Sequence, residues 1–232
     1  MFQFKQFTIR QDRTPMKVGT DGVLLGAWAA TEKALTILDA GTGTGVIALM
    51  SAQRNPLARI DAIEIEPDAC RQAIENIRAS RWKERIQVWE SALQTFSPPH
   101  LYDCIVCNPP FFINSTKTPD RGRTLARHTD SLPHEELLEH ASRLLAPAGN
   151  LCVILPAENE ELFLRQAGNA GLYAQHITRV HPIPGKPPKR CLLRLGRKPV
   201  DTPTEDHLTI ELSRHQYSEE YIRLTHEFYL YL

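Results

Sequence analysis

An asparagine, two prolines and a phenylalanine, Asn108-Pro109-Pro110-Phe111, follow an apolar segment that has the composition of a buried strand. Proline has no N–H to donate to a sheet, so the strand is expected to end at Asn108. The chain is therefore stiff where it leaves the strand, with a carboxamide on one side and an aromatic ring on the other. These groups could accept hydrogen bonds from an amino group and stack against a planar base.

A glycine-rich segment, Asp39-Ala-Gly-Thr-Gly-Thr-Gly45, follows another apolar strand and opens a helix. Its glycines let a ligand approach the backbone closely, because no Cβ is in the way. Their spacing differs from the GxGxxG of dinucleotide-binding proteins. Glu64 ends the next strand, where a ribose-binding carboxylate belongs, and Asp39 suits an ammonium group. The pair favours a ligand with a nucleoside end and an amino acid end, S-adenosylmethionine; the alternative is a turn that only tightens strand–helix packing.

These motifs must be positioned by the strands and helices that alternate from Ala34 onward. Nearly continuous apolar strands are typical of a parallel sheet covered on both faces, with its ligand at the carboxyl ends of the strands. Strands are expected at 34–38, 59–64, 85–89, 102–107 and 151–155, and helices at 46–53, 67–80, 133–145 and 159–167. Segments 173–183 and 189–197 are joined by a connection too short for a helix, so we expect them to pair antiparallel. A last helix at about 218–228 is expected to cap the sheet edge.

Length and composition describe one globular domain. The 232 residues are 42% hydrophobic and 23% charged, as in soluble proteins. We expect an N-terminal arm and short helix that contribute to the cofactor site (1–33), a catalytic core (34–200) and a C-terminal extension with the capping helix (201–232). The sequence shows no membrane span and no signal peptide, so the expected location is the cytoplasm. The single CxxC, Cys104 to Cys107, lacks a second ligand pair, so the five cysteines are expected to be buried thiols without a metal.

The net charge is zero, which argues against a general nucleic-acid coat protein. Basic residues nevertheless gather in one stretch that contains no acid: Arg179, Lys186, Lys189, Arg190, Arg194, Arg197 and Lys198. Such a local basic stripe is compatible with binding one particular nucleic acid.

The motif order DAGTGTG, AIEIEPDAC and CNPPFF resembles that of class I S-adenosylmethionine-dependent methyltransferases that act on amino groups. KVGTDGVLLGAWA near the start and EYIRLTHEFYLYL at the end narrow the resemblance to the bacterial tRNA1(Val) (adenine(37)-N6)-methyltransferases. The resemblance implies a Rossmann-like, doubly wound α/β fold with a seven-stranded, mostly parallel sheet and an antiparallel last strand. It also implies methyl transfer to the N6 amino group of an adenine in tRNA, at position 37 of the anticodon loop of a valine tRNA. We further expect a monomer, and chemistry that needs no metal.

The candidate site residues fall into three groups: the motifs and the resemblance indicate the catalytic and cofactor groups, and the positions of the basic residues indicate the RNA-binding group. The catalytic group is Asn108, Pro109, Pro110 and Phe111, with the Asn108 side chain and the Pro109 carbonyl accepting bonds from the amino group and Phe111 stacking on the base. The cofactor group is Thr20, Asp21, Asp39, Gly41, Gly43, Gly45, Glu64, Ser91 and Ala92. Many relatives have an Asp where Ala92 stands, so the adenine contact is left open. The RNA-binding group comprises Arg121, Arg123, Arg127, His128, Lys186, Lys189 and Arg190.

Three other functions share some of these motifs. A methyltransferase acting on another RNA would use the same chemistry. Protein methyltransferases that act on glutamine amides also use Asn-Pro-Pro and an aromatic residue, but they carry a sizeable helical domain before the cofactor loop, where this chain has fewer than forty residues. A cofactor-binding RNA chaperone without catalysis would not need Asn108 and Phe111.

Overall fold

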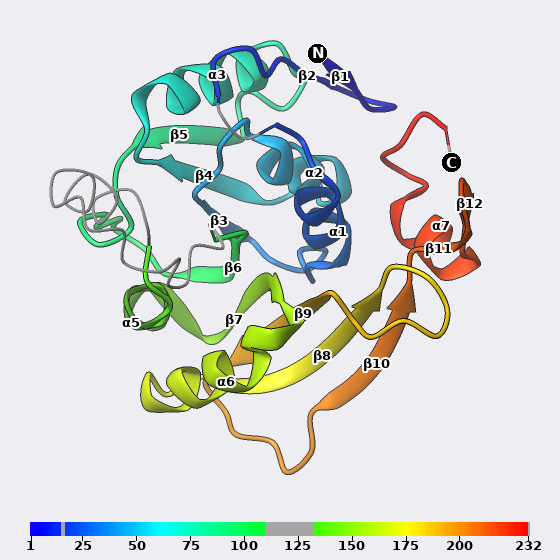
Figure 1. Ribbon diagram of the computed structural model, residues 1–232. Coiled ribbons are helices and arrows are strands. Elements are labelled where there is room, and N and C mark those ends of the chain that lie inside the picture. Colours follow the sequence, from blue (N-terminus) through cyan, green and yellow to red (C-terminus); the bar gives the residue numbers. More distant parts are fainter. Residues whose placement is uncertain (15–16, 110–131, 232) are drawn as a thin grey trace, which may run out of the picture.

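The computed structural model describes residues 1–14, 17–109 and 132–231. Its centre is an eight-stranded sheet with the strand order β10-β8-β9-β7-β6-β3-β4-β5 (Figure 1). The strands are β3 (Thr36–Ala40), β4 (Arg59–Glu64), β5 (Ile86–Glu90), β6 (Tyr102–Cys107), β7 (Leu145–Pro156), β8 (Tyr173–His181), β9 (Arg190–Gly196) and β10 (Thr204–Thr209). Only β9 runs antiparallel to its neighbours among these strands. The sheet confirms the doubly wound α/β fold and the antiparallel pairing of β8 with β9.

Helices cover both faces of this sheet, as the apolar strands require. They are α1 (Thr20–Trp28), α2 (Val46–Arg54), α3 (Pro67–Arg78), α5 (His134–Leu144), α6 (Glu160–Asn169) and α7 (Glu219–Thr225), with a 3-10 turn η1 (Ala157–Asn159). Successive residues of one strand enter opposite cores: Ile37 packs with α1 and α2, whereas Leu38 packs with α5 and α6. This alternation follows from the period of two in a strand.

The number of strands differs from the seven expected, because β10 adds an eighth at the edge of the sheet. It pairs parallel with β8, from Thr204 opposite His176 to Thr209 opposite His181. Of its six residues only Leu208 is buried, so the segment lacks the apolar pattern that identifies a strand. Within the C-terminal extension, α7 packs on β10 and α1, three residues shorter at its end than expected.

Two short hairpins also lie outside the expected elements. β1 (Phe2–Gln3) pairs with β2 (Thr8–Ile9), where an extended arm was expected, and β11 (Glu211–Ser213) pairs with β12 (Gln216–Tyr217). The first hairpin lies against the C-terminal segment: Phe4 forms a bridge with Tyr229, and the Lys5 N–H donates to the Phe228 carbonyl at 2.8 Å. The two ends of the chain therefore lie on the same side of the molecule (Figure 1).

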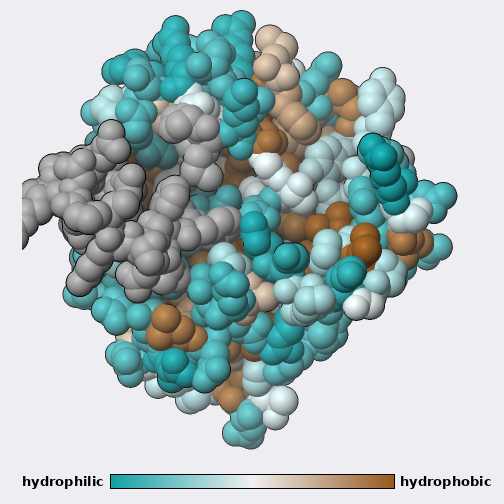
Figure 2. Space-filling view, in the orientation of Figure 1, coloured by the Kyte–Doolittle hydropathy of each residue, from teal (hydrophilic) through white to brown (hydrophobic). Residues whose placement is uncertain are grey.

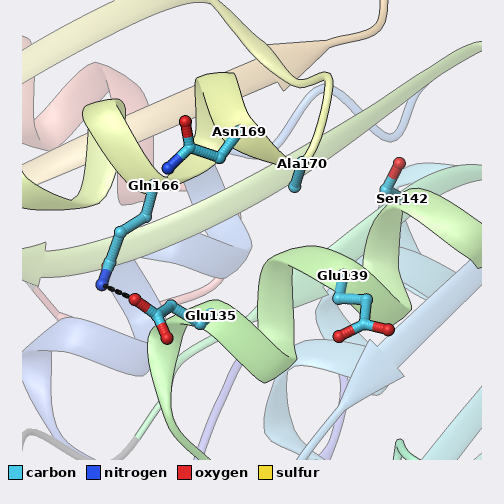
Figure 3. Close-up of a pocket in the computed structure, with 6 residues that line it drawn as sticks. All are labelled: Glu135, Glu139, Ser142, Gln166, Asn169 and Ala170. Atoms are coloured by element: carbon cyan, nitrogen blue, oxygen red, sulfur yellow. Dashed lines mark hydrogen bonds between the residues drawn. The ribbon is translucent and has the colours of Figure 1, made fainter.

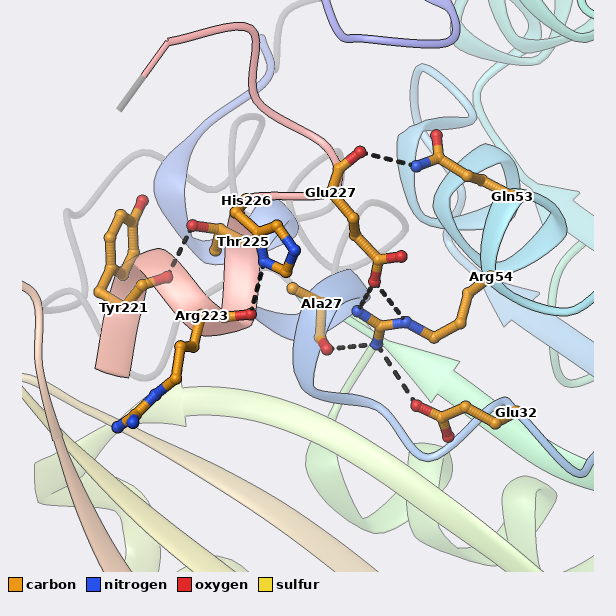
Figure 4. A network of polar contacts seen from close by, with 9 residues as sticks. All are labelled: Ala27, Glu32, Gln53, Arg54, Tyr221, Arg223, Thr225, His226 and Glu227. Atoms are coloured by element: carbon orange, nitrogen blue, oxygen red, sulfur yellow. Dashed lines mark hydrogen bonds and ion pairs between the residues drawn. The ribbon is translucent and has the colours of Figure 1, made fainter. Parts of the chain in front are cut away.

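Arg54, at the end of α2, ties α1 to the segment after α7 (Figure 4). Its guanidinium donates to the Ala27 carbonyl and to the Glu227 carboxylate, and it lies 5.0 Å from the centre of the Phe228 ring. The side chain of Arg54 is only 11% exposed. Because these bonds are shielded from water, they fix the C-terminal half of α1 firmly.

All five cysteines are buried and unpaired, which confirms the expectation of buried thiols. Within the described ranges, no three His, Cys, Asp or Glu side chains gather as metal ligands. No helix in the described part of the chain is long and apolar enough to cross a bilayer.

Candidate active site

The sheet brings the two motifs to one edge. Strands β6, β3 and β4 are neighbours, with Cys107 opposite Ala40 and Ala40 opposite Ile63. The residues that follow these positions, Asn108, Gly41 and Glu64, therefore emerge side by side at the carboxyl ends of parallel strands. This is where a doubly wound sheet binds its ligand.

The glycines of the loop between β3 and α2 have two roles: some leave space for a ligand and one allows close helix packing. Gly41, Gly43 and Gly45 have φ angles of 74°, 55° and 83°, a region that favours glycine. A Cβ at Gly41 or Gly43 would meet no atom within 4 Å, whereas one at Gly45 would lie 3.4 Å from the Ile77 Cδ1 atom. Gly41 and Gly43 thus leave an open cradle of the kind a ligand fills, and Gly45 lets α2 pack closely on α3.

Asp39 lies buried beneath this loop, with 1% of its surface exposed. Its Oδ2 atom accepts from the Thr42 hydroxyl at 2.5 Å and from the Ala48 N–H at 3.0 Å, while its Oδ1 atom is buried and has no partner in the part of the chain that the structure describes. Burial raises the pKa of Asp39 to about 7, although both hydrogen bonds oppose the shift. An acceptor left unpaired in this way is costly unless a ligand or a proton satisfies it.

Glu64 holds the loop as well as facing the edge. Its Oε2 atom accepts from the Gly43 N–H at 2.8 Å, and its Oε1 atom accepts from the N–H groups of Ile65 and Glu66 at 2.9 and 3.0 Å. A carboxylate has about four acceptor positions, so three are used within the chain. Ribose hydroxyls would have to take the remaining one or displace Gly43.

Ser91 and Ala92 follow β5 and lie beside Glu64. The Ser91 N–H donates to the Glu64 carbonyl at 2.9 Å, and the Ser91 hydroxyl donates to the Ala92 carbonyl at 3.1 Å. Ile65 stands next to them with 55% of its surface exposed. The sequence analysis did not select Ile65; its signal is an apolar residue directly after the strand-end acid.

Asn108 leaves β6 with its side chain partly buried, and Pro109 after it is buried. The Asn108 Oδ1 atom is buried and accepts no hydrogen bond from the described residues. On the other side of the carboxamide, a Cβ built on Gly22 of α1 would lie 3.9 Å from Asn108 Nδ2. The first turn of α1 is therefore a wall of the site. Pro110 and Phe111 lie outside the described residues.

Thr20 and Asp21 belong to that first turn, so the structure brings the N-terminal part of the predicted cofactor group to the same edge as Asn108. The Asp21 Oδ2 atom accepts from Arg190 Nε at 2.9 Å. The sequence assigned these two residues to different ligands, Asp21 to the cofactor and Arg190 to RNA. Their contact links the two predicted groups.

Asn76 of α3 anchors the loop and was missed by the sequence analysis. Its amide Nδ2 donates to the Thr44 carbonyl at 2.8 Å and to the Arg10 carbonyl at 2.9 Å, and its Oδ1 atom accepts from the Arg10 N–H at 2.9 Å. Asn76 is buried, so it joins the N-terminal arm to the glycine loop. A polar residue on the apolar face of α3 was the available signal.

The predicted RNA-binding residues that the structure describes lie in the turn from β8 to β9. Arg190 starts β9 opposite Pro156, the last residue of β7, so this turn is at the same edge as Asn108. Lys186 and Lys189 are exposed. The other four (Arg121, Arg123, Arg127 and His128) lie outside the described residues.

The basic stripe is not continuous in space. Arg179 forms ion pairs with Glu160 and Glu205 at 2.5 and 2.8 Å, and the paired oxygens raise its pKa, opposed by burial. Arg197 donates to the carbonyls of Ser142 and Leu145. These two arginines hold elements together, which leaves Lys186 and Lys189 as exposed cations of the stripe near the site.

A pocket between α5 and α6 lies elsewhere (Figure 3). It is lined by Glu135, Glu139, Ser142, Gln166, Asn169 and Ala170. Ser142 is near the end of α5 and Ala170 follows α6, and these helices run back from the carboxyl edge of the sheet. None of the candidate site residues is among its lining residues.

A doubly wound sheet with a glycine loop after its first strand, a strand-end acid after its second and Asn-Pro after β6 defines a class I methyltransferase. The family described as "Methyltransferase small domain" matches residues 18–167. A protein of Parabacteroides distasonis named "tRNA1(Val) (adenine(37)-N6)-methyltransferase" is 52% identical, covering 99% of this chain and 97% of its own. One of the same name from Flavobacterium johnsoniae is 49% identical, covering 99% of both chains. The chain belongs to the family of tRNA1(Val) (adenine(37)-N6)-methyltransferases.

Solved structures agree on the fold. A predicted O-methyltransferase from Agrobacterium tumefaciens superposes with a TM-score of 0.70 at 20% identity, covering 90% of this chain and 96% of that one. A ribosomal protein L11 methylase from Lactobacillus delbrueckii superposes with a TM-score of 0.54 at 17% identity, covering 76% and 77%. The cofactor of this class of enzyme is S-adenosylmethionine, and the open cradle at Gly41 and Gly43 beside the unpaired Asp39 Oδ1 fits it.

Substituting Gly43 with alanine is expected to weaken cofactor binding more than folding. The new Cβ would occupy the open cradle, and its positive φ costs about 1–2 kcal/mol of stability. Gly171, between α6 and β8, has a φ of 72° and also no atom within 4 Å of a built Cβ, so Gly171→Ala is a matched control for backbone strain. Calorimetry should find weaker S-adenosylmethionine binding in Gly43→Ala only. Equal affinity in both variants would remove Gly43 from the cradle.

Proposed function

We propose that this enzyme transfers a methyl group from S-adenosylmethionine to the N6 amino group of adenine 37 in the anticodon loop of a valine tRNA. The observation that carries the proposal is the buried Oδ1 atom of Asn108, which lies at the same edge as the glycine loop and has no partner among the described residues. An N–H donor from a substrate would satisfy this acceptor. The relatives' printed activity supports an adenine in tRNA as that substrate.

The chemistry asked of Asn108 is to make a poor nucleophile reactive. The lone pair of an exocyclic amino nitrogen is delocalised into its ring. When Asn108 Oδ1 and the Pro109 carbonyl oxygen accept hydrogen bonds from its two N–H groups, the nitrogen is drawn toward tetrahedral geometry. Its lone pair is then free to attack. When bound, S-adenosylmethionine supplies a methyl group on a positively charged sulfur. Because Pro109 is fixed, the acceptors need little reorganisation as charge develops, and the extra proton leaves afterwards to water.

Cofactor binding is assigned to the carboxyl edge of the sheet. In the proposal, Glu64 faces the ribose, Asp39 the ammonium group, and Ser91, Ala92 and exposed Ile65 the adenine. Thr20, Asp21 and the three loop glycines complete the site. Charge-assisted bonds from a carboxylate contribute about 1.5–3 kcal/mol each, so the two acids would dominate affinity.

RNA binding is assigned to Phe111 and to the cations near the edge. A stacked base gains about 1–3 kcal/mol, and extruding a paired base costs a few, so a loop base is the favoured target. Lys186 and Lys189, with the four residues outside the described ranges, form the proposed phosphate contacts, whereas the Arg190 side chain is paired with Asp21. The face seen in Figure 2 suits a polar partner, since hydrophilic residues predominate among those described and hydrophobic ones form small separate patches.

The proposal also includes a monomeric enzyme in the cytoplasm, where its tRNA substrate resides. Sedimentation of the purified protein, alone and with tRNA, tests the monomer. A dimer in the absence of tRNA would contradict it.

The function is tested by incubating the protein with methyl-labelled S-adenosylmethionine and either total cellular tRNA or total cellular protein. We expect label in tRNA, recovered as N6-methyladenosine after digestion. Label in protein would support a glutamine methyltransferase, and label in another RNA a different nucleic-acid substrate. Cofactor binding without transfer to either fraction would support a non-catalytic RNA-binding protein.

A further inference from the structure

The first turn of α1 is held differently from the rest of the helix. Farther along, Gly26 lies against Met50 of α2, where a Cβ would come within 2.7 Å of the sulfur, and Arg54 binds the Ala27 carbonyl (Figure 4). The amino end has no side-chain cap at Gly19. An ion pair between Asp21 of this turn and Arg190 of β9 connects it to the sheet.

Arg190 reaches Asp21 from a rigid position. It is the first residue of β9 and lies opposite Pro156 in β7 and Val180 in β8. The preceding residue is also fixed, since the Lys189 N–H donates to Val180 at 2.8 Å and its carbonyl accepts from Ala157 at 3.2 Å. The side chains of Arg190 and Asp21 are 32% and 23% exposed, so water screens the pair only in part.

We propose that Arg190 is a positioning residue that holds the first turn of α1 against Asn108, through Asp21, and not a ligand for tRNA phosphate. The turn carries Gly22, where a built Cβ would lie 3.9 Å from Asn108 Nδ2. A shift of this wall would change the direction of Asn108 Oδ1. The proposal rests on the proposed tRNA activity only for its kinetic readout.

Lys189 offers the matched comparison. It is adjacent to Arg190, exposed and basic, and successive strand residues point to opposite faces. If Arg190 positions α1 while Lys189 binds a tRNA phosphate, removing the two charges should affect tRNA affinity and turnover differently. Lys189→Gln should weaken tRNA binding and reduce its slope against salt concentration by about one.

Arg190→Gln should lower turnover about 10- to 100-fold, the size expected from misplacing a catalytic group by an ångström, and should leave the salt slope unchanged. In the Asp21→Asn background the same change should add nothing further, because the pair is already broken. The measurements are single-turnover methyl transfer and tRNA affinity over a range of salt, with melting temperatures for all variants.

Two results would overturn the proposal. One is a fall in the salt slope for Arg190→Gln equal to that for Lys189→Gln. The other is a turnover in the Asp21→Asn/Arg190→Gln double variant that is reduced by the product of the two single reductions, which would show that the two residues act independently. If the wild-type protein does not methylate tRNA, the proposed function fails, but the ion pair is still tested by hydrogen exchange. The amide hydrogens of residues 23–25 should then exchange faster in Arg190→Gln than in the wild type, and at the wild-type rate in Lys189→Gln. Equal exchange rates in the wild type and both variants would overturn the proposal.

Discussion

Replacing Asn108 with alanine is expected to slow methyl transfer about 100-fold or more while leaving cofactor and tRNA affinity close to wild type. The magnitude is that of removing one preorganised hydrogen-bonding group from an active site. The bonds that Asn108 makes to the amino group strengthen as the nitrogen becomes tetrahedral and positive, so they serve the transition state more than the bound substrate. Single-turnover transfer at saturating cofactor and tRNA measures the loss.

The stability of the Asn108→Ala variant distinguishes a catalytic role of Asn108 from a structural one. Asn108 Oδ1 is buried without a partner among the described residues, so its deletion breaks no hydrogen bond that this atom makes to them. The melting temperature of Asn108→Ala should therefore equal or exceed that of the wild type. Asn169→Ala, an exposed residue at the end of α6, is the control. A folded Asn108→Ala enzyme with near wild-type transfer would defeat the mechanism.

Asp39 should make both stability and cofactor affinity depend on pH. Its folded-state pKa is about 7 against an ordinary 3.8, so the folded chain binds a proton that the unfolded chain releases between those values. Stability conferred by the neutral form is therefore lost as the pH rises from about 4 to 7 and is constant above. The loss is at most on the order of 4 kcal/mol.

Asp39→Asn removes this titration. It should be more stable than wild type at pH 8 by up to a few kcal/mol and equal to it near pH 4, as measured by urea unfolding. If the Asp39 carboxylate binds the cofactor's ammonium group, wild-type affinity should rise up to tenfold per pH unit below 7 and then level off. The asparagine variant should bind weakly at every pH, whereas Asp201→Asn, an exposed control, should follow wild type. A cofactor affinity of the wild type that does not change with pH would show that the Asp39 carboxylate does not bind the ammonium group.

The sheet core was predictable because each central strand is buried on both faces. Arg59–Glu64 and Tyr102–Cys107 have the bounds that the sequence predicts. β10 and the short hairpins were not predictable, because exposed side chains carry no pattern and their pairing partners are set by tertiary contacts. The polar residues of β10, for instance, are strand residues only because β8 lies beside them.

The position of the candidate site at the carboxyl edge of the sheet was predictable from the sequence, but the hydrogen bonds between its side chains were not. Glycine spacing and strand ends located the loop, Glu64 and Asn108. Nothing in the sequence indicates that Glu64 holds the Gly43 N–H, or that Arg190 pairs with a residue 169 positions away. Such contacts depend on side-chain directions that only the assembled sheet defines.

The contact between the first hairpin and the C-terminal segment has a consequence for how the chain folds. The Lys5 ammonium donates to the His226 carbonyl across 221 residues at 2.5 Å, and Phe4 and Phe228 are both fully buried. Closing so long a loop is entropically costly before its contacts form. We therefore expect this seam to close late in refolding and to open early in unfolding, so that mutations at Phe4 speed unfolding and hardly change the folding rate.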